Sequence, residues 1–186
     1  MAERHERVSD VDDGAADEVQ PEEIQQFWEM ARGRARLGGL DVVTGGSVAS
    51  TIPPQAWAFG DSPRLADELL ALVVEGTKRA TASSVAELQA AGEQIPVPGD
   101  LSIVLDGAGH PRVLLRTTHV DVVPFDEVTE EFAALEAEDD RSLASWRREH
   151  ERYFRRVLEG TGTEFSADLP VVCERFEVLY PKARDR

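Results

Sequence analysis

The sequence predicts an α+β fold, a small mixed β-barrel with helices packed around it. Apolar residues recur at helical spacing in some segments and alternate in others, so both helices and strands are expected. The segments follow the order helix, strand, helix, several strands, two acidic helices and a final strand. This order lacks the regular alternation of strand and helix that builds a doubly wound parallel sheet. Hydrophobic residues make up 41% of the 186 residues, which is enough for one domain with a real core.

Charge and cysteine content exclude several classes of protein. The formal net charge is -16, and the acids are spread along the whole chain, so a broad phosphate-binding surface of clustered Lys and Arg is not expected. Cys173 is the only cysteine, so no intramolecular disulfide is expected. No apolar run is long enough to span a bilayer, and the first residues are polar and acidic, unlike a secretory signal. We therefore expect a cytoplasmic protein without a membrane partner.

The two ends of the chain are predicted to be tails around one domain. Residues 1–20 carry many acids and almost no large apolar groups, so a disordered acidic tail is expected. The domain itself covers 21–181, and 182–186 form a C-terminal tail. Its first helix starts at Pro21 and runs to about residue 37, with Arg side chains in its last turns. Glycines, small residues and two prolines then indicate a linker over 41–54.

The best-specified element is a helix that follows a short strand over 55–59. Asp61 or Ser62 can cap this helix, and Pro63 occupies the first helical position, where its missing N–H costs nothing. Leucines and a valine at helical spacing predict one buried face. Gly76 stands where a left-handed residue ends a helix. The loop that follows carries Lys78.

The rest of the domain divides into strands and short helices. Alternation and turn residues predict these elements in order: a β-prone segment at 81–84, a helical turn at 85–91, strands at 101–105 and 112–123, helices at 125–135 and 142–158, and a final strand from Pro170. In the final strand one face carries alternating apolar residues, and Glu174 interrupts this pattern. The run from Asp126 to Asp140 contains eight acids and no base.

Lys78 and Thr81 are the first candidates for chemistry. The chain has 20 Lys plus Arg, and Lys78 and Lys182 are its two lysines. A desolvated lysine can lose its proton, or it can serve as a compact anion contact. An amine beside Thr81 could activate the hydroxyl as a nucleophile, with a carboxylate as third member. Alternatively, Thr81 bonds to its own backbone, and Lys78 falls in this loop by chance.

Carboxylates for such a site come from the acidic run: Glu136, Glu138, Asp139 and Asp140. Arg116, in mid-strand, needs an acidic partner or an anion if it is covered; otherwise it faces solvent. The four histidines show no paired metal-ligand spacing, so no metal and no other cofactor is expected.

Several short motifs occur in a particular order along the chain. The loop Gly76–Thr81 has the pattern Gly-x-Lys-x-x-Thr after a helix. The accompanying motifs are WAFGDSP at 57–63, PGD at 98–100, RTT at 116–118, FDEV at 125–128 and EAEDDRSL at 136–143, followed by Trp146 and His150. Together these segments resemble the ASCH domain, a relative of the PUA domain, over about residues 21–181. The chain resembles longer bacterial members with an added N-terminal helix.

The resemblance implies a PUA-like barrel with a cleft between barrel and helices. It implies recognition of RNA or of a modified nucleoside, with a nucleoside, a nucleotide or a short single-stranded RNA as ligand. Some small members hydrolyse the amide of N4-acylated cytidines, and others have been described as ribonucleases. On that basis Lys78 and Thr81 carry over directly, with Glu138 as the first and Glu136 as the second choice of carboxylate. Under the same resemblance, a base could stack on Trp57, Phe59 or Trp146, unless these rings belong to the core. The alternatives are a non-catalytic module that binds RNA or a nucleotide-like ligand, and a protein-interaction domain with an acidic surface.

Overall fold

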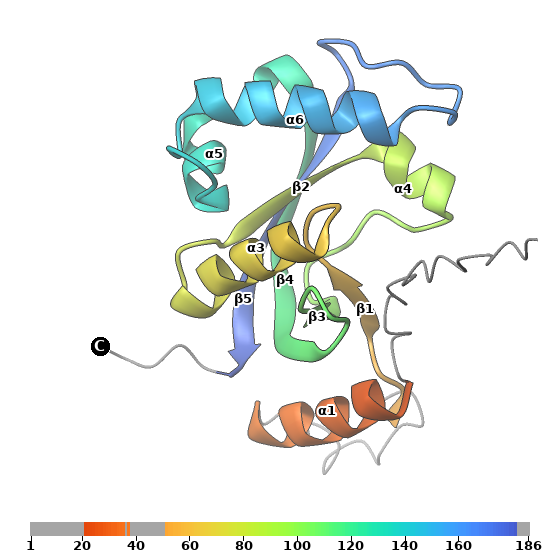
Figure 1. Cartoon of the computed structure of the whole chain (residues 1–186), viewed down its shortest axis with the longest axis vertical. Coiled ribbons are helices and arrows are strands. Elements are labelled where there is room, and N and C mark those ends of the chain that lie inside the picture. Colours follow the sequence, from red (N-terminus) through yellow and green to blue (C-terminus); the bar gives the residue numbers. More distant parts are fainter. Residues whose placement is uncertain (1–20, 36, 38–50, 182–186) are drawn as a thin grey trace, which may run out of the picture.

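The computed structural model describes residues 21–35, 37 and 51–181 (Figure 1). The predicted tails over 1–20 and 182–186, and the linker up to residue 50, lie outside the described residues. None of the described helices combines the length and the apolar character needed to cross a membrane.

The centre of the fold is a five-stranded mixed sheet that forms a half-barrel, which confirms the predicted fold class (Figure 1). The strands are β1 (Gln55–Ala58), β2 (Ala80–Ser84), β3 (Leu101–Leu105), β4 (Pro111–Pro124) and β5 (Pro170–Tyr180), in the spatial order β1-β3-β4-β5-β2. β1 runs parallel to β3, and the other pairs are antiparallel. A register shift between Thr117 and His119 interrupts the long β4–β5 ladder, as a β-bulge does.

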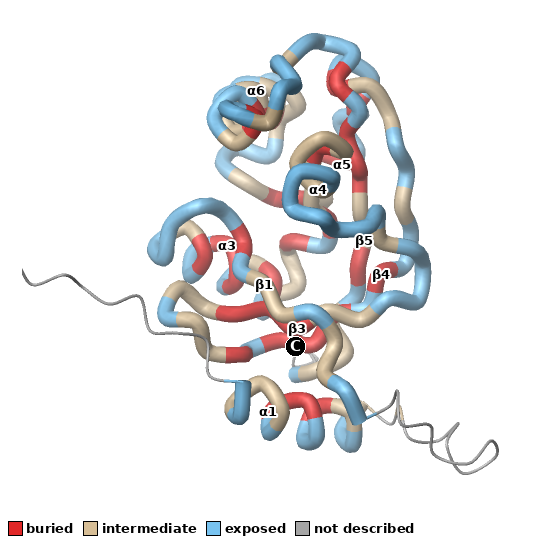
Figure 2. The backbone as a smooth tube through the Cα atoms, turned by 90° about the vertical axis from the view of Figure 1, so that its right-hand side faces the viewer, coloured by how far each residue is buried: buried red, intermediate tan, exposed pale blue. Residues whose placement is uncertain are grey.

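Five described α-helices cover the sheet: α1 (Pro21–Arg34), α3 (Pro63–Glu75), α4 (Val85–Ala91), α5 (Glu130–Glu136) and α6 (Leu143–Val157). Three buried clusters hold them in place. One lies under α5 and α6 around Phe154, one lies under α3 around Val73, and one lies under α1 around Ala31. In Figure 2 the buried segments face inward between these helices and the sheet. The helices α3 and α6 thus pack on different buried clusters.

Two helix predictions need correction. The first helix ends at Arg34 rather than near residue 37, and Gly33 in its last turn is a weak helix former. The helix predicted over 125–135 is instead a short 3-10 turn, Phe125–Glu127, followed by α5. The break occurs because Val128 is extended and the Thr129 side chain accepts the N–H of Phe132, which starts a new helix.

The capping of α3 is confirmed and decides between the two predicted caps. The Ser62 hydroxyl accepts the N–H of Leu65, while Asp61 pairs with Arg156 across the molecule. At the other end Gly76 adopts φ 80°, in the left-handed region. The Lys78 N–H then donates to the Leu72 carbonyl at 3.0 Å. The end of α3 therefore sets the direction in which the Lys78 side chain leaves the backbone.

Candidate functional site

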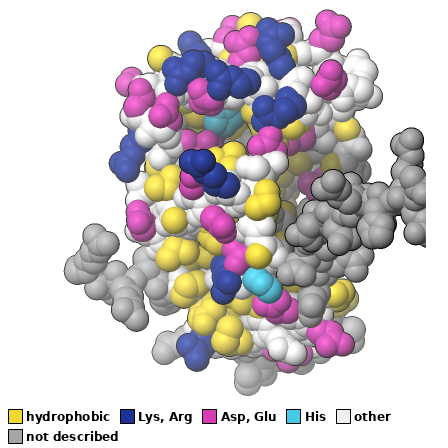
Figure 3. Space-filling model, viewed as in Figure 1, with side chains coloured by type: hydrophobic (Ala, Val, Ile, Leu, Met, Phe, Trp, Pro, Cys, Tyr) yellow, Lys and Arg dark blue, Asp and Glu magenta, His cyan; other side chains and the backbone are white. Residues whose placement is uncertain are grey.

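A pocket of about 970 Å³ lies between α3 and α6, and we call it the central pocket. Strands β1, β2 and β5 also contribute to it, as do α4 and the loop between α5 and α6. Apolar side chains of α3 and β1 form part of its lining. Its polar lining includes Thr81, Glu136, Glu138, Asp139, Arg148, Glu149, Arg152, Arg156 and Glu174. In Figure 3, Lys and Arg side chains gather at the end of this face that α6 covers.

Lys78 lies at the base of this arrangement and is completely buried. Its Nζ donates to Glu138 Oε1 at 2.5 Å, to Glu136 Oε2 at 3.1 Å and to the Glu136 carbonyl at 3.5 Å. An ammonium has three N–H donors, so all three have acceptors. The Nζ atom also lies 5.3 Å from the centre of the Phe59 ring. The predicted lysine and both predicted glutamates therefore meet in one cluster.

The electrostatics of this cluster keep Lys78 charged. Burial alone would lower its pKa, but the charges of Glu136 and Glu138 outweigh this and raise the pKa above the ordinary 10.5. A lysine in this state has no lone pair with which to accept a proton. In this geometry, Lys78 is the cation that holds two carboxylates in place.

The two glutamates differ in what they face. Glu136 is buried, and its Oε1 accepts the indole N–H of Trp146 at 2.8 Å. His150 Nε2 lies 3.5 Å from the same oxygen. Glu138 retains 29% of its side-chain exposure and lines the central pocket. Glu138 is thus placed to meet a ligand, whereas most of the hydrogen-bonding capacity of Glu136 is used inside the protein.

The pKa of Glu136 predicts how stability depends on pH. Burial would raise this pKa, but Lys78, His150 and the Trp146 N–H together lower it below 4.5. A depressed folded-state pKa stabilises the protein above the unfolded-state value, and this contribution is lost as pH falls through the folded-state pKa. We expect the difference in unfolding free energy between the wild type and Glu136→Gln to shrink below pH 4.5. Urea titrations from neutral to acidic pH test this; a constant difference would contradict it.

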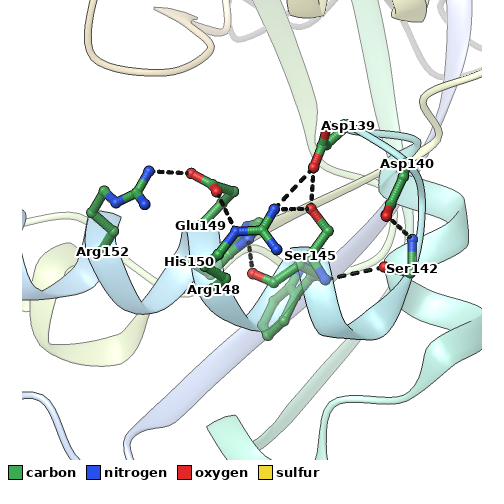
Figure 4. A network of polar contacts seen from close by, with 9 residues as sticks. Asp139, Asp140, Ser142, Ser145, Arg148, Glu149, His150 and Arg152 are labelled. Carbon is green, nitrogen blue, oxygen red and sulfur yellow. Dashed lines mark hydrogen bonds and ion pairs between the residues drawn. The ribbon is translucent and has the colours of Figure 1, made fainter.

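The loop between α5 and α6 that carries Glu138 has an unusual backbone. Ala137, Asp139 and Arg141 all adopt positive φ, which is costly for residues with a Cβ. Contacts with α6 hold the loop (Figure 4): Asp139 accepts the Ser145 hydroxyl and pairs with Arg148. Ser142 is the N-cap of α6, which agrees with the predicted start of this helix at residue 142. Such strain, held by surrounding contacts, is typical of functional loops.

Glu136, Glu138 and His150 also satisfy the spacing of a metal site, since one ligand atom from each lies within 4.8 Å of the others. His150 Nδ1 lies 3.0 Å from the Trp146 carbonyl, so Nε2 could be the free ligand atom. Both carboxylates, however, already contact the Lys78 ammonium. A divalent ion would have to displace this cation or tolerate its repulsion, and these residues therefore fit a lysine better than a metal.

Thr81 lies on β2 and lines the central pocket. Within the described part of the chain, its hydroxyl has no hydrogen-bond partner, and no bond joins it to Lys78. In the β2–β5 ladder its direct partner is Glu174. The structure thus brings Thr81 and Glu138 to the same pocket, with Lys78 behind the carboxylate.

The predicted ligand-binding side chains divide into two groups. Trp57 and Phe59 line the pocket, with their rings packed edge to face at 4.6 Å. Trp146 is a core residue stacked on His150 at 4.1 Å, outside the pocket lining. Arg116 is exposed, also lies outside the lining, and pairs with Glu177.

Other pocket residues were not selected from the sequence. Three arginines line the wall formed by α6: Arg148, Arg152 and Arg156. Their spacing of four residues in the sequence indicates that they lie on one face of the helix. Glu174 lies on β5 and lines the pocket. In the sequence it is marked out because it interrupts the alternation of apolar residues in this strand. Neither signal shows by itself that a residue faces a cavity.

Comparisons with known proteins identify the family and support the fold. A model of the ASCH domain family matches residues 55–180, more than half of the chain. Protein EF3133 from Enterococcus faecalis V583, described as DUF984, is similar in structure with a TM-score of 0.70 and 31% identity, over 89% of this chain and 95% of that one. The ASCH domain from Lactobacillus crispatus JV V101 gives a TM-score of 0.64 and 29% identity, over 79% and 94%. No curated protein matches.

Proposed function

This chain belongs to the ASCH domain family, and on that premise we propose that its central pocket binds a nucleoside, a nucleotide or a short single-stranded RNA. One observation carries the proposal: the partly exposed Glu138 carboxylate lines the pocket and is fixed in place by its ion pair with the buried Lys78 ammonium. A carboxylate in this state accepts hydrogen bonds from the amino group of a base, as Glu and Asp do from cytosine N4.

The other walls of the pocket suit the remaining parts of such a ligand. Trp57 and the leucines of α3 offer an apolar surface for the face of a base. Arg148, Arg152 and Arg156 line the α6 wall, where a ribose or a phosphate can lie. Their present ion pairs are with exposed or half-exposed acids, and such pairs exchange at little cost. The volume also lies within the range of small-molecule sites.

The first test is a binding measurement. Calorimetry or NMR titration should show that the wild type binds cytidine, a cytidine nucleotide or a short single-stranded RNA. Glu138→Gln should weaken binding by about tenfold, because the neutral amide oxygen accepts a weaker hydrogen bond than the charged carboxylate does. Glu177→Gln is the matched control, since Glu177 is exposed, pairs with Arg116 and lies outside the pocket lining. Absence of binding to all three ligands would reject the proposal.

A second candidate function is hydrolysis of an N4-acylated cytidine. The observation that favours it is the Thr81 hydroxyl, unpartnered within the described residues, in the same pocket as Glu138. Thr81 would attack the acyl carbon, and the carbon–nitrogen bond would break as the hydroxyl proton passes to the departing cytosine amine. Water would then hydrolyse the Thr81 ester, which releases the acid and restores the hydroxyl. Because Lys78 is held as a cation, it would have to lose a proton before it could accept one from Thr81.

The hydrolysis candidate is tested with N4-acetylcytidine. We expect Thr81→Val, which keeps the shape but removes the hydroxyl, to lower turnover by at least about a hundredfold, the lower range for a group that takes part in the chemical step. Thr81→Ser restores a hydroxyl and should recover part of the activity. If the wild type shows no turnover, hydrolysis of this substrate is rejected. The proposal of ligand binding is decided separately, by the binding titration.

A further inference from the structure

Glu174 is a carboxylate of the central pocket for which the described part of the fold supplies no cation. It lies in the middle of β5, between Cys173 and Arg175, and lines the pocket. Within the described residues, the carboxylate has one hydrogen-bond partner, the Thr117 hydroxyl, which donates to Oε1 at 2.6 Å. Lys78 contacts Glu136 and Glu138 instead. Glu174 is thus a partly buried acid with hydrogen-bonding capacity to spare.

The surroundings of Glu174 disfavour its charged form. Burial raises its pKa, and the nearby charge of Asp100 adds to this, while the Thr117 hydrogen bond opposes it. A carboxyl whose folded-state pKa is raised costs stability at pH values above that pKa. An apolar or amide side chain would avoid this cost at the same position. Residues that lower stability while facing a cleft are typical of functional sites.

Glu174 also lies directly beside Thr81. The two residues are register partners in the antiparallel β2–β5 ladder, so their side chains project from the same face of the sheet. Both line the central pocket, and the Thr81 hydroxyl has no partner in the described structure. A hydroxyl and a carboxylate therefore lie side by side at one edge of the pocket.

We propose that Glu174 contacts the ligand and selects bases that present an amino group over bases that present a carbonyl oxygen at the same position. A carboxylate accepts from the N4 amino group of cytosine but repels the O4 oxygen of uracil. Thr81 can donate or accept, so it tolerates either base. The selection at this edge of the pocket accordingly comes from Glu174. This inference rests on the proposed binding of a nucleoside.

The test compares cytidine and uridine in the full chain. The wild type should bind cytidine at least about tenfold more tightly than uridine. Glu174→Gln should reduce this ratio severalfold, because a glutamine amide can turn to donate to O4 as well as accept from N4. The preference that remains is the contribution of Glu138. Glu177→Gln, the control on the same strand, should leave the ratio unchanged. A ratio that stays the same in Glu174→Gln, or a wild type that binds both nucleosides equally, overturns the inference.

Stability distinguishes a ligand contact from a structural role. Glu174→Gln should keep or raise the thermal midpoint at neutral pH, because it removes an acid whose charged form is disfavoured. A lowered midpoint with an unchanged binding ratio would assign Glu174 to structure and overturn the inference. If Glu174→Gln does not fold, Glu174→Asp withdraws the carboxylate by one methylene and should also reduce the preference; full preference overturns the inference. A wild type that binds no nucleoside overturns this inference, and one that also binds no nucleotide and no short single-stranded RNA rejects the proposed function itself.

Discussion

Replacement of Lys78 by methionine is expected to destabilise the protein by about 3–5 kcal/mol. The ammonium is fully buried and is the cation shared by Glu136 and Glu138. Without it, the buried Glu136 carboxylate must either stay charged without its main partner or take up a proton. Breaking a buried ion pair from one side is costly because the remaining charge is left uncompensated.

Urea unfolding of the wild type, Lys78→Met, Glu136→Gln and the double variant measures this effect. The double variant should be more stable than the sum of the single losses predicts, since both charges are then absent. Arg64→Met is the control, because the Arg64–Glu68 pair is exposed and should contribute little. A loss in Lys78→Met as small as the loss in Arg64→Met would contradict the buried ion-pair geometry.

The stability of Lys78 variants also decides how their function is interpreted. A Lys78 variant that lacks binding or activity shows nothing about chemistry unless it is folded. Thr81→Val, Glu138→Gln and Glu174→Gln are better probes, because Thr81 is half-buried, Glu138 is partly exposed and Glu174 carries no ion pair within the described residues.

Gly107→Ala is expected to cost about 3 kcal/mol, at the upper end of the usual range for overpacking. A Cβ at this position would lie 2.1 Å from the carbonyl oxygen of Pro63, at the start of α3. The obstacle is backbone and cannot rotate away as a side chain does. The Gly107 N–H also donates to Asp67 Oδ1 at 2.8 Å. The turn between β3 and β4 is therefore held against α3 both by this hydrogen bond and by the close contact with Pro63.

Thermal and urea unfolding measure the Gly107 effect, with Gly33→Ala as control. Gly33 lies in α1, where a Cβ added to it would have no described neighbouring atom within 4 Å. Alanine at this position should therefore stabilise the helix by about 0.5–1 kcal/mol. Equal effects of the two substitutions would contradict the close packing of Gly107 under Pro63.

Local features of the chain were largely predictable from sequence. The cap and the first residue of α3, its glycine end, and the strands β3, β4 and β5 follow from residue preferences that act over a few positions. The rarity of lysine was enough to single out Lys78. Boundaries failed where preferences conflict, as at Val128, where an apolar residue that fits a helical face instead separates two helices.

The candidate site shows where local preferences cease to decide. Composition, periodicity and capping determined the α+β class, the element order and the choice of Lys78, Thr81 and the acidic run, because each depends on neighbours in sequence. The tertiary structure alone decided that Lys78 is a buried cation bound to both Glu136, 58 residues away, and Glu138. It also separated Trp146 and Arg116 from the pocket and placed Glu174 beside Thr81. These outcomes depend on strand register and helix packing between distant segments, and no local pattern encodes them.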